Sequence, residues 1–311
     1  MDKGLNASSH EPDLSQFRAF GLLITYCLIY VLPLYASPAT RAVAGRPRDA
    51  PEAIRARIRS VSLSTALCSL VTFVLVKRSP ISLNVSPWNL MGYWPIGMVE
   101  AGKTVLLTGL LFLGPLYECL LIDGNWRSWS SLDPLKQVWS DLAVWRNMVA
   151  GPITEECLFR SSAVPLLLMA GCDRKSIIFL SPLVFGLAHL HHFYEFRVTH
   201  PRTQLGVAVA RSVLQLSYTT VFGAYATFLF LRTGSLLAVV AVHTFCNSMG
   251  LPRVWGLLEP YWLLGGSNYQ KISALKWTIP YYVLLLGGLV LWWQHLLSLT
   301  TSSTALFTLE L

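Results

Sequence analysis

Three apolar runs without a charged residue constrain this chain more than any other feature. They are residues 21–36, 61–76 and 279–293. A stretch of about 20 mostly apolar residues crosses a bilayer as a helix, because a helix satisfies its own backbone hydrogen bonds. Only 13% of the residues are charged, whereas soluble domains carry about a quarter. The sequence therefore predicts an integral membrane protein.

Eight apolar segments predict an all-α membrane protein, a bundle of about eight transmembrane helices in one polytopic domain, residues 1–311. No internal repeat divides the chain. The segments are residues 17–37, 58–76, 101–122, 142–170, 176–194, 206–231, 234–250 and 279–299. The seventh is short for a full crossing.

Charge and cysteine content exclude several other classes of protein. The formal net charge is +8, but the basic residues lie mostly in short loops between apolar runs. That placement predicts contact with lipid headgroups and no nucleic-acid partner. The six cysteines lie mostly inside apolar segments and form no CxxC pair, which argues against a disulfide framework or a zinc finger.

The loop between the first two segments predicts the orientation of the chain. It contains six arginines, at positions 41, 46, 48, 55, 57 and 59. The positive-inside rule assigns such a loop to the cytoplasm. Alternation then places residues 127–146, 197–202 and 253–276 on the same side and both termini on the far side.

The first polar cluster inside an apolar segment is Glu155 and Glu156, followed by Arg160. A charge at the bilayer centre costs about 2.5–3.5 kcal/mol on insertion scales, so such residues are functional candidates. On a helix Glu156 and Arg160 share a face and predict an ion pair, while Glu155 points about 100° away and is available to take a proton. A purely structural ion pair would not account for the second glutamate.

The second cluster contains Phe185 and His189, with His191 and His192 shortly after. His189 lies inside the fifth segment, where an imidazole can act as a general acid or base or bind a metal. A hydrogen bond between helices is the simpler interpretation of a single membrane histidine. His191 and His192, with Glu195, also fit an interfacial polar cap.

The third cluster is His243 and Asn247 in the seventh segment. Four residues apart, they share one helix face. An imidazole and a carboxamide side by side are suitable donors to a developing oxyanion. The alternative is that they only hydrogen-bond neighbouring helices.

Together the clusters provide a base, an acid and oxyanion donors, the set needed to hydrolyse an amide with water. No GxSxG elbow and no HExxH motif accompany them. Cys157 adjoins two carboxylates, which disfavour the thiolate of a cysteine nucleophile. We therefore predict water activated directly by a carboxylate. A metal held by Glu155, His189 and His243 stays open as a variant.

These motifs resemble those of the type II CAAX prenyl endopeptidases, the Ras-converting enzyme family within the Abi or CPBP superfamily of membrane proteases. Residues 46–49, 146–156 and 216–232 are similar to the eukaryotic branch. The strong similarity covers a catalytic core of about residues 140–255, with weaker similarity from about residue 45 onward. The matching motif residues are Glu155, Glu156 and Arg160, then Phe185 and His189, then His243 and Asn247.

The resemblance implies an intramembrane endopeptidase that removes the C-terminal tripeptide, aaX, from farnesylated or geranylgeranylated CAAX proteins such as Ras-like GTPases. It implies a multi-pass protein of the endoplasmic reticulum membrane, with a polar cavity open to the cytosol and to lipid. No metal or other cofactor is required by the family's mechanism. The resemblance assigns water activation to Glu155 with His189, oxyanion binding to His243 and Asn247, and support of the site to Glu156, Arg160 and Phe185.

Two other functions use similar residues. Paired carboxylates and histidines carry protons through transporters, although transporters often contain internal repeats. A non-catalytic scaffold for prenylated proteins is the second alternative, and it needs none of the four candidate catalytic side chains.

Overall fold

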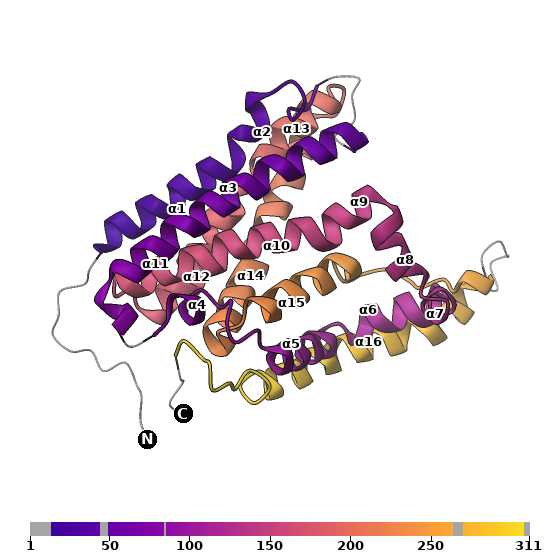
Figure 1. Ribbon diagram of the computed structural model, residues 1–311. Coiled ribbons are helices and arrows are strands. Elements are labelled where there is room, and N and C mark those ends of the chain that lie inside the picture. Colours follow the sequence, from indigo (N-terminus) through magenta and orange to yellow (C-terminus); the bar gives the residue numbers. More distant parts are fainter. Residues whose placement is uncertain (1–13, 44–48, 84, 264–269, 308–311) are drawn as a thin grey trace.

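The computed structural model describes residues 14–43, 49–83, 85–263 and 270–307, and every regular element in these ranges is a helix (Figure 1). The predicted all-α membrane fold is confirmed. Five helical stretches are long and apolar enough to cross a membrane, and at 1.5 Å per residue each covers the hydrocarbon core. They are Gln16–Ala36, Pro51–Arg78, Arg174–Thr199, Leu205–Thr233 and Ala274–His295.

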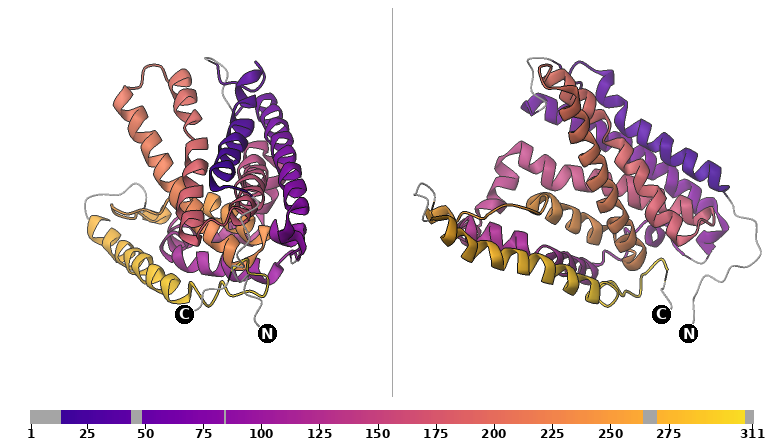
Figure 2. Two further views of the ribbon diagram at one scale, coloured as in Figure 1. Left: turned by 90° about the vertical axis from the view of Figure 1, so that its left-hand side faces the viewer. Right: turned by 180° about the vertical axis from the view of Figure 1, so that it is seen from behind.

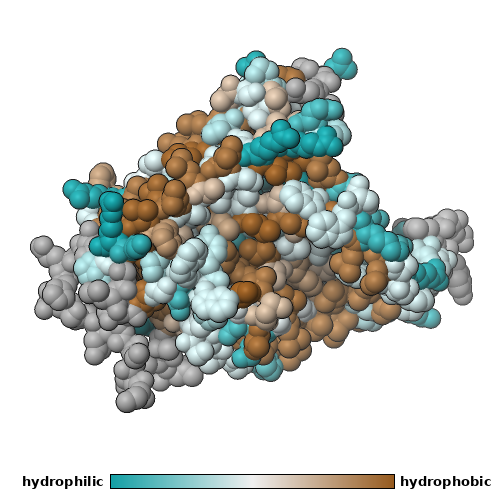
Figure 3. All heavy atoms as spheres, viewed as in Figure 1, coloured by the Kyte–Doolittle hydropathy of each residue, from teal (hydrophilic) through white to brown (hydrophobic). Residues whose placement is uncertain are grey.

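These five stretches correspond to the first, second, fifth, sixth and eighth predicted segments. Their elements are α1 (Gln16–Val31) with α2 (Pro33–Ala36), α3 (Pro51–Arg78), α12 (Arg174–Ala188) with α13 (His191–Thr199), α14 (Leu205–Thr233) and α16 (Gln270–His295). Large apolar side chains face outward along them, and Leu63, Val221 and Val283 are each more than 60% exposed. Figure 3 shows hydrophobic surface along the flanks of α1 and α3, as lipid contact requires.

The third predicted segment is not one straight span, which corrects the prediction for residues 101–122. Helix α5 (Met98–Leu111) is followed by α6 (Leu113–Tyr117), which continues into a π-helical turn (Glu118–Ile122). The two parts, Met98–Leu111 and Leu113–Ile122, are bent by 83° relative to each other. Pro115 explains the break, because it has no N–H to donate to the carbonyl four residues earlier. The bent pair is either a broken span or a re-entrant loop, and α16 runs along it (Figure 2).

Two further helices carry the first and third polar clusters. The fourth segment is a continuous course of short elements: α9 (Leu142–Trp145), a π-helical turn (Arg146–Ala150), α10 (Gly151–Glu156), a second π-helical turn (Cys157–Ser162) and α11 (Ala163–Met169). Helix α15 (Leu236–Met249) has 14 residues. Among the described residues, neither belongs to the five long apolar stretches, because α15 is short and the fourth segment contains charges.

Contacts between loops show how the helices alternate. Arg146 pairs with Asp49 at 2.7 Å, and Arg57 of α3 pairs with Glu195 of α13, so the loops that precede α3, α9 and α14 lie at one end. At the other end, the Leu236 N–H donates to the Gly92 carbonyl at 2.9 Å. Three of the four loops expected to share a side, those before α3, α9 and α14, therefore lie together. Two short helices, α7 (Trp126–Ser130) and α8 (Asp133–Ser140), occupy the loop before α9.

Candidate active site

The two adjacent glutamates of α10 lie in different surroundings. Glu156 is completely buried, whereas the side chain of Glu155 is 21% exposed and lines a cavity. A π-helical turn lies on each side of α10, a geometry that is common at functional sites. The predicted difference between the two carboxylates, one paired and one accessible, is present in the structure.

Glu156 is at the centre of a buried polar network. Its Oε1 accepts hydrogen bonds from Arg160 Nη1 at 3.1 Å and from His243 Nδ1 at 2.6 Å. Arg160 also donates to the Gly223 carbonyl of α14 at 3.2 Å, and its guanidinium lies 4.6 Å from the ring centre of Phe185. The predicted ion pair is thus confirmed. It joins the fourth segment to α12, α14 and α15.

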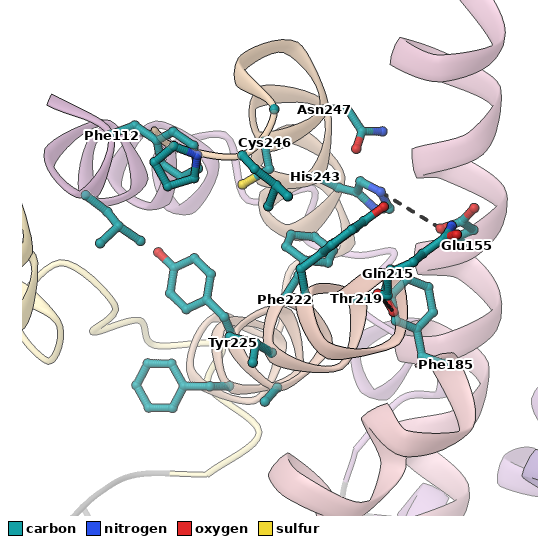
Figure 4. Close-up of a pocket in the computed structure, with 18 of the residues that line it drawn as sticks. Phe112, Glu155, Phe185, Gln215, Thr219, Phe222, Tyr225, His243, Cys246 and Asn247 are labelled. Carbon is teal, nitrogen blue, oxygen red and sulfur yellow. Dashed lines mark hydrogen bonds and ion pairs between the residues drawn. The ribbon is translucent and has the colours of Figure 1, made fainter. Parts of the chain in front are cut away.

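His243 lies between the two glutamates. Its Nδ1 donates to Glu156, and its Nε2 is 3.9 Å from Oε2 of Glu155 (Figure 4). Phe222 covers the imidazole, with ring centres 4.7 Å apart. Because Nδ1 already carries a proton for Glu156, Nε2 donates to an oxyanion only when the ring carries both protons.

His189 has its tautomer set by the backbone. Its Nδ1 lies 2.9 Å from the Phe185 carbonyl, which can only accept, so Nδ1 carries the hydrogen. In the neutral ring Nε2 then has the lone pair, as a base requires. Phe185 is 2% exposed, and its ring lies between the guanidinium of Arg160 and the imidazole of His189, 4.9 Å from the latter.

Asn247 is held by the helix that carries the glutamates. Its Nδ2 donates to the Asn147 carbonyl at 2.9 Å. A carboxamide has two N–H groups, so this bond orients the side chain and leaves a second N–H as a donor for a substrate oxygen. His243 and Asn247 project from the same side of α15, as their spacing predicts (Figure 4).

One cavity of about 970 Å³ brings the four candidate catalytic residues together. Glu155, His189, His243 and Asn247 come from three helical segments that are far apart in the sequence, and all line its wall. The rest of the wall is mostly apolar and comes from α5, α12, α14 and α16. Its aromatic residues include Phe112, Phe179, Tyr218, Tyr225, Phe228 and Trp292.

The open metal variant is not supported by the geometry. Within the described part of the chain, Glu155, His189 and His243 do not form a group whose ligand atoms all lie close together. The group that does so is His191, His192 and Glu195, within 4.8 Å of one another.

Several residues of the cavity wall were not predicted from the sequence. Gln215, Thr219 and Phe222 of α14 line the wall, and their spacing of four and three residues places them on one helix face. Gln215 and Thr219 are polar residues on one face of an otherwise apolar helix, and this pattern could have predicted that the face lines a polar site. His192 also lines the cavity, and only the tertiary structure shows this.

Comparison with known proteins gives consistent matches. The sequence model of the family described as type II CAAX prenyl endopeptidase Rce1-like matches residues 137–249. "Probable CAAX prenyl protease 2" of Schizosaccharomyces pombe is 38% identical over 277 residues, 89% of this chain and 92% of the relative. "CAAX prenyl protease 2" of Homo sapiens is 38% identical over 226 residues, 68% and 66% of the two chains. The Arabidopsis thaliana protein of that name is 34% identical, covering 78% and 82%. No solved structure matches the chain.

Proposed function

Because this chain belongs to the type II CAAX prenyl endopeptidase family, we propose that the cavity lined by Glu155, His189, His243 and Asn247 is where it hydrolyses its substrates. The protein is a multi-pass membrane protease, a CAAX prenyl endopeptidase that acts on prenylated CAAX proteins. The observation that carries the assignment of the site is the convergence of four separate polar side chains on one mostly apolar cavity.

Glu155 is the general base in the proposed mechanism. Its carboxylate is the accessible one of the pair, whereas Glu156 is bound by Arg160 and His243. Glu155 takes a proton from a water molecule as the water oxygen attacks the scissile carbonyl. His189, with the lone pair of Nε2 available in the neutral ring, orients the same water.

His243 and Asn247 stabilise the oxyanion that forms during the attack. Preorganised donors of this kind stabilise the charge that develops on the oxygen in the transition state. Asn247 offers the second N–H of its carboxamide, and His243 offers Nε2–H when its ring is doubly protonated. Phe185, Glu156 and Arg160 hold these groups in position and take no direct part.

The substrate is delivered at the depth of the cavity by its lipid. Each buried CH₂ of a prenyl chain contributes about 0.8 kcal/mol to membrane affinity, and the aromatic wall formed by α12, α14 and α16 suits either a farnesyl or a geranylgeranyl chain. We place the protein in the endoplasmic reticulum membrane with the site accessible from the cytosol. The arginine-rich loop before α3 supports that orientation.

A cleavage assay tests this function. Purified full-length protein in detergent is incubated with a farnesylated CAAX peptide and with the same peptide lacking the prenyl group, and release of the tripeptide is measured. We expect release from the prenylated peptide only. Glu155→Gln, which keeps the size of the side chain, and Glu155→Ala should both abolish it.

Control measurements separate loss of chemistry from loss of fold. Each variant is compared with wild type in melting temperature and in elution from size exclusion. Near-normal turnover by folded Glu155→Gln would remove Glu155 from the role of base, and cleavage of both peptides at equal rates would argue against recognition of the prenyl chain.

A further inference from the structure

A second histidine, His192 of α13, lines the same cavity as Glu155 and His189. Its ring centre lies 5.8 Å from that of His189. Its Nδ1 is 3.0 Å from Oε2 of Glu195, and Glu195 is 2% exposed. The guanidinium of Arg57, from α3, contacts the other carboxylate oxygen of Glu195.

The carboxylate defines what the imidazole of His192 can do. Paired with the buried guanidinium of Arg57, Glu195 is an ionised acceptor, so Nδ1 of His192 carries the hydrogen. The bond fixes the tautomer and the orientation of the ring, as a carboxylate does for a catalytic histidine. Nε2 is then the nitrogen that gains or loses a proton.

Arg57 is itself held in place. Its Nε donates to the Thr40 carbonyl at 2.8 Å, so the guanidinium is fixed between the loop after α2 and the carboxylate. The side chains of Arg57 and Glu195 are only 11% and 3% exposed. His192 is therefore oriented by a chain of buried charged contacts that begins on another helix.

Hydrolysis of an amide needs a group of this type. The amine leaves the tetrahedral intermediate readily only if its nitrogen is protonated. Glu155 and His189 act on the water, and His243 and Asn247 act on the oxyanion, so none of the four is assigned to the leaving nitrogen. Among the residues that line the cavity, His192 is the histidine without a role in these two tasks.

We propose that His192 is a catalytic residue of this site, the general acid that protonates the leaving nitrogen, with Glu195 and Arg57 as its positioning residues. The inference rests on the proposed function of the cavity. As the C–N bond breaks, its electron pair goes to nitrogen, which takes the Nε2 proton of the His192 imidazolium, while the oxyanion re-forms the carbonyl. Glu155 then loses the proton of the water to solvent, and His192 regains one.

A metal site is the competing interpretation of these residues. Atoms of His191, His192 and Glu195 lie within 4.8 Å of one another, which is compatible with a cation. Arg57 argues against it, because its guanidinium already supplies the positive charge beside the carboxylate. A divalent ion would have to bind next to that charge or displace it.

A pair of substrates separates the general-acid role from a structural one. The first is the farnesylated CAAX peptide, and the second is its ester analogue, with oxygen in place of the scissile nitrogen. An alkoxide leaves far more easily than an amide anion, so the ester depends much less on a general acid. His192→Gln preserves a donor to Glu195 but cannot deliver a proton. We expect kcat on the amide to fall by about 10²-fold, with KM unchanged and kcat on the ester close to wild type.

The matched control is His200→Gln, the same substitution at a histidine just beyond the end of α13. Nδ1 of His200 lies 2.9 Å from the Thr199 hydroxyl, and within the described chain His200 is not among the residues that line the cavity. This variant should cleave both substrates as wild type does. Glu195→Gln should reproduce the selective loss on the amide in weaker form, since it keeps an oxygen for Arg57.

Several outcomes would overturn the assignment. Equal losses of His192→Gln on amide and ester would make His192 structural, and an unchanged kcat on the amide would remove it from the reaction. Inactivation of wild type by a chelator, reversed by zinc, would make the group a metal site. Failure of the proposed function gives other results: wild type would release no tripeptide from the prenylated peptide, or folded Glu155→Gln would still release it.

Discussion

At the scale of single residues, the site depends on how one buried carboxylate is shared. Oε1 of Glu156 accepts from both Arg160 and His243. Removing one member of a buried ion pair typically costs about 3–5 kcal/mol, because an uncompensated charge remains. The cluster therefore explains why Arg160, which touches no substrate in the proposed mechanism, belongs to the motif.

Asn247→Ala tests the oxyanion assignment at this scale. The substitution removes the carboxamide donor, and loss of one such donor lowers kcat by about 10²–10³-fold. We expect KM to change little, because the donor acts mainly in the transition state. Steady-state kinetics on the farnesylated peptide give both constants.

Ser248→Ala is the control for that variant. Ser248 is exposed and donates to the Phe245 carbonyl of its own helix, so its loss should leave kcat at the wild-type value. An Asn247→Ala protein that keeps normal kcat would reduce Asn247 to a contact between α15 and the Asn147 carbonyl.

At the scale of elements, the crossing of α12 and α14 sets the position of Arg160. Gly223 makes the close approach possible. A Cβ added there would lie 2.8 Å from Pro182 Cβ and 3.3 Å from Nη2 of Arg160. The glycine therefore serves both the packing of two helices and the hydrogen bond that its carbonyl accepts from the guanidinium.

Gly223→Ala should destabilise the protein through this crossing. Overpacking of a close contact costs about 1–3 kcal/mol, and the displaced guanidinium should also reduce kcat. The measurement is the melting temperature in detergent, together with turnover. Gly102→Ala in α5 is the matched control, since a Cβ there meets nothing within 4 Å. A Gly223→Ala protein as stable and active as that control would contradict the proposed packing role.

At the scale of the whole molecule, the ends of the helices form two groups of loops. One group includes the arginine-rich loop before α3, α7 and α8, and the loop after α13. The other includes the loop before α5, where the Gly92 carbonyl accepts from Leu236 at the start of α15, and the segment after α16. In that segment the Leu306 N–H donates to the Leu231 carbonyl at 2.9 Å. The positive-inside rule assigns the first group to the cytosol.

N-glycosylation in microsomes tests that orientation. The chain contains acceptor sequences at Asn6 and Asn84, both predicted on the lumenal side, where glycan transfer takes place. We expect a glycosidase-sensitive mobility shift that the double variant Asn6→Gln and Asn84→Gln removes. Ser128→Asn, which creates Asn-Trp-Ser in α7, should then add no glycan to the double variant. A glycan at position 128 would reverse the orientation.

The sequence by itself determined the helices and the three polar clusters. Hydropathy and spacings of four residues are local properties, so they identified the ion pair of Glu156 with Arg160 and the shared face of His243 and Asn247. The bend between α5 and α6 also has a local cause, Pro115. Hydropathy alone does not predict it, because a bent helix is as apolar as a straight one.

Only the tertiary structure decided which polar groups meet. Glu156 and His243 are 87 residues apart, and nothing in their local patterns specifies a shared hydrogen bond. The same holds for His192. Its sequence context fits an interfacial polar cap, whereas the structure shows that Arg57 of α3 pairs with Glu195 and that the imidazole of His192 lines the cavity. Contacts of this kind depend on how helices cross, and crossing is set by the packing of side chains from several segments at once.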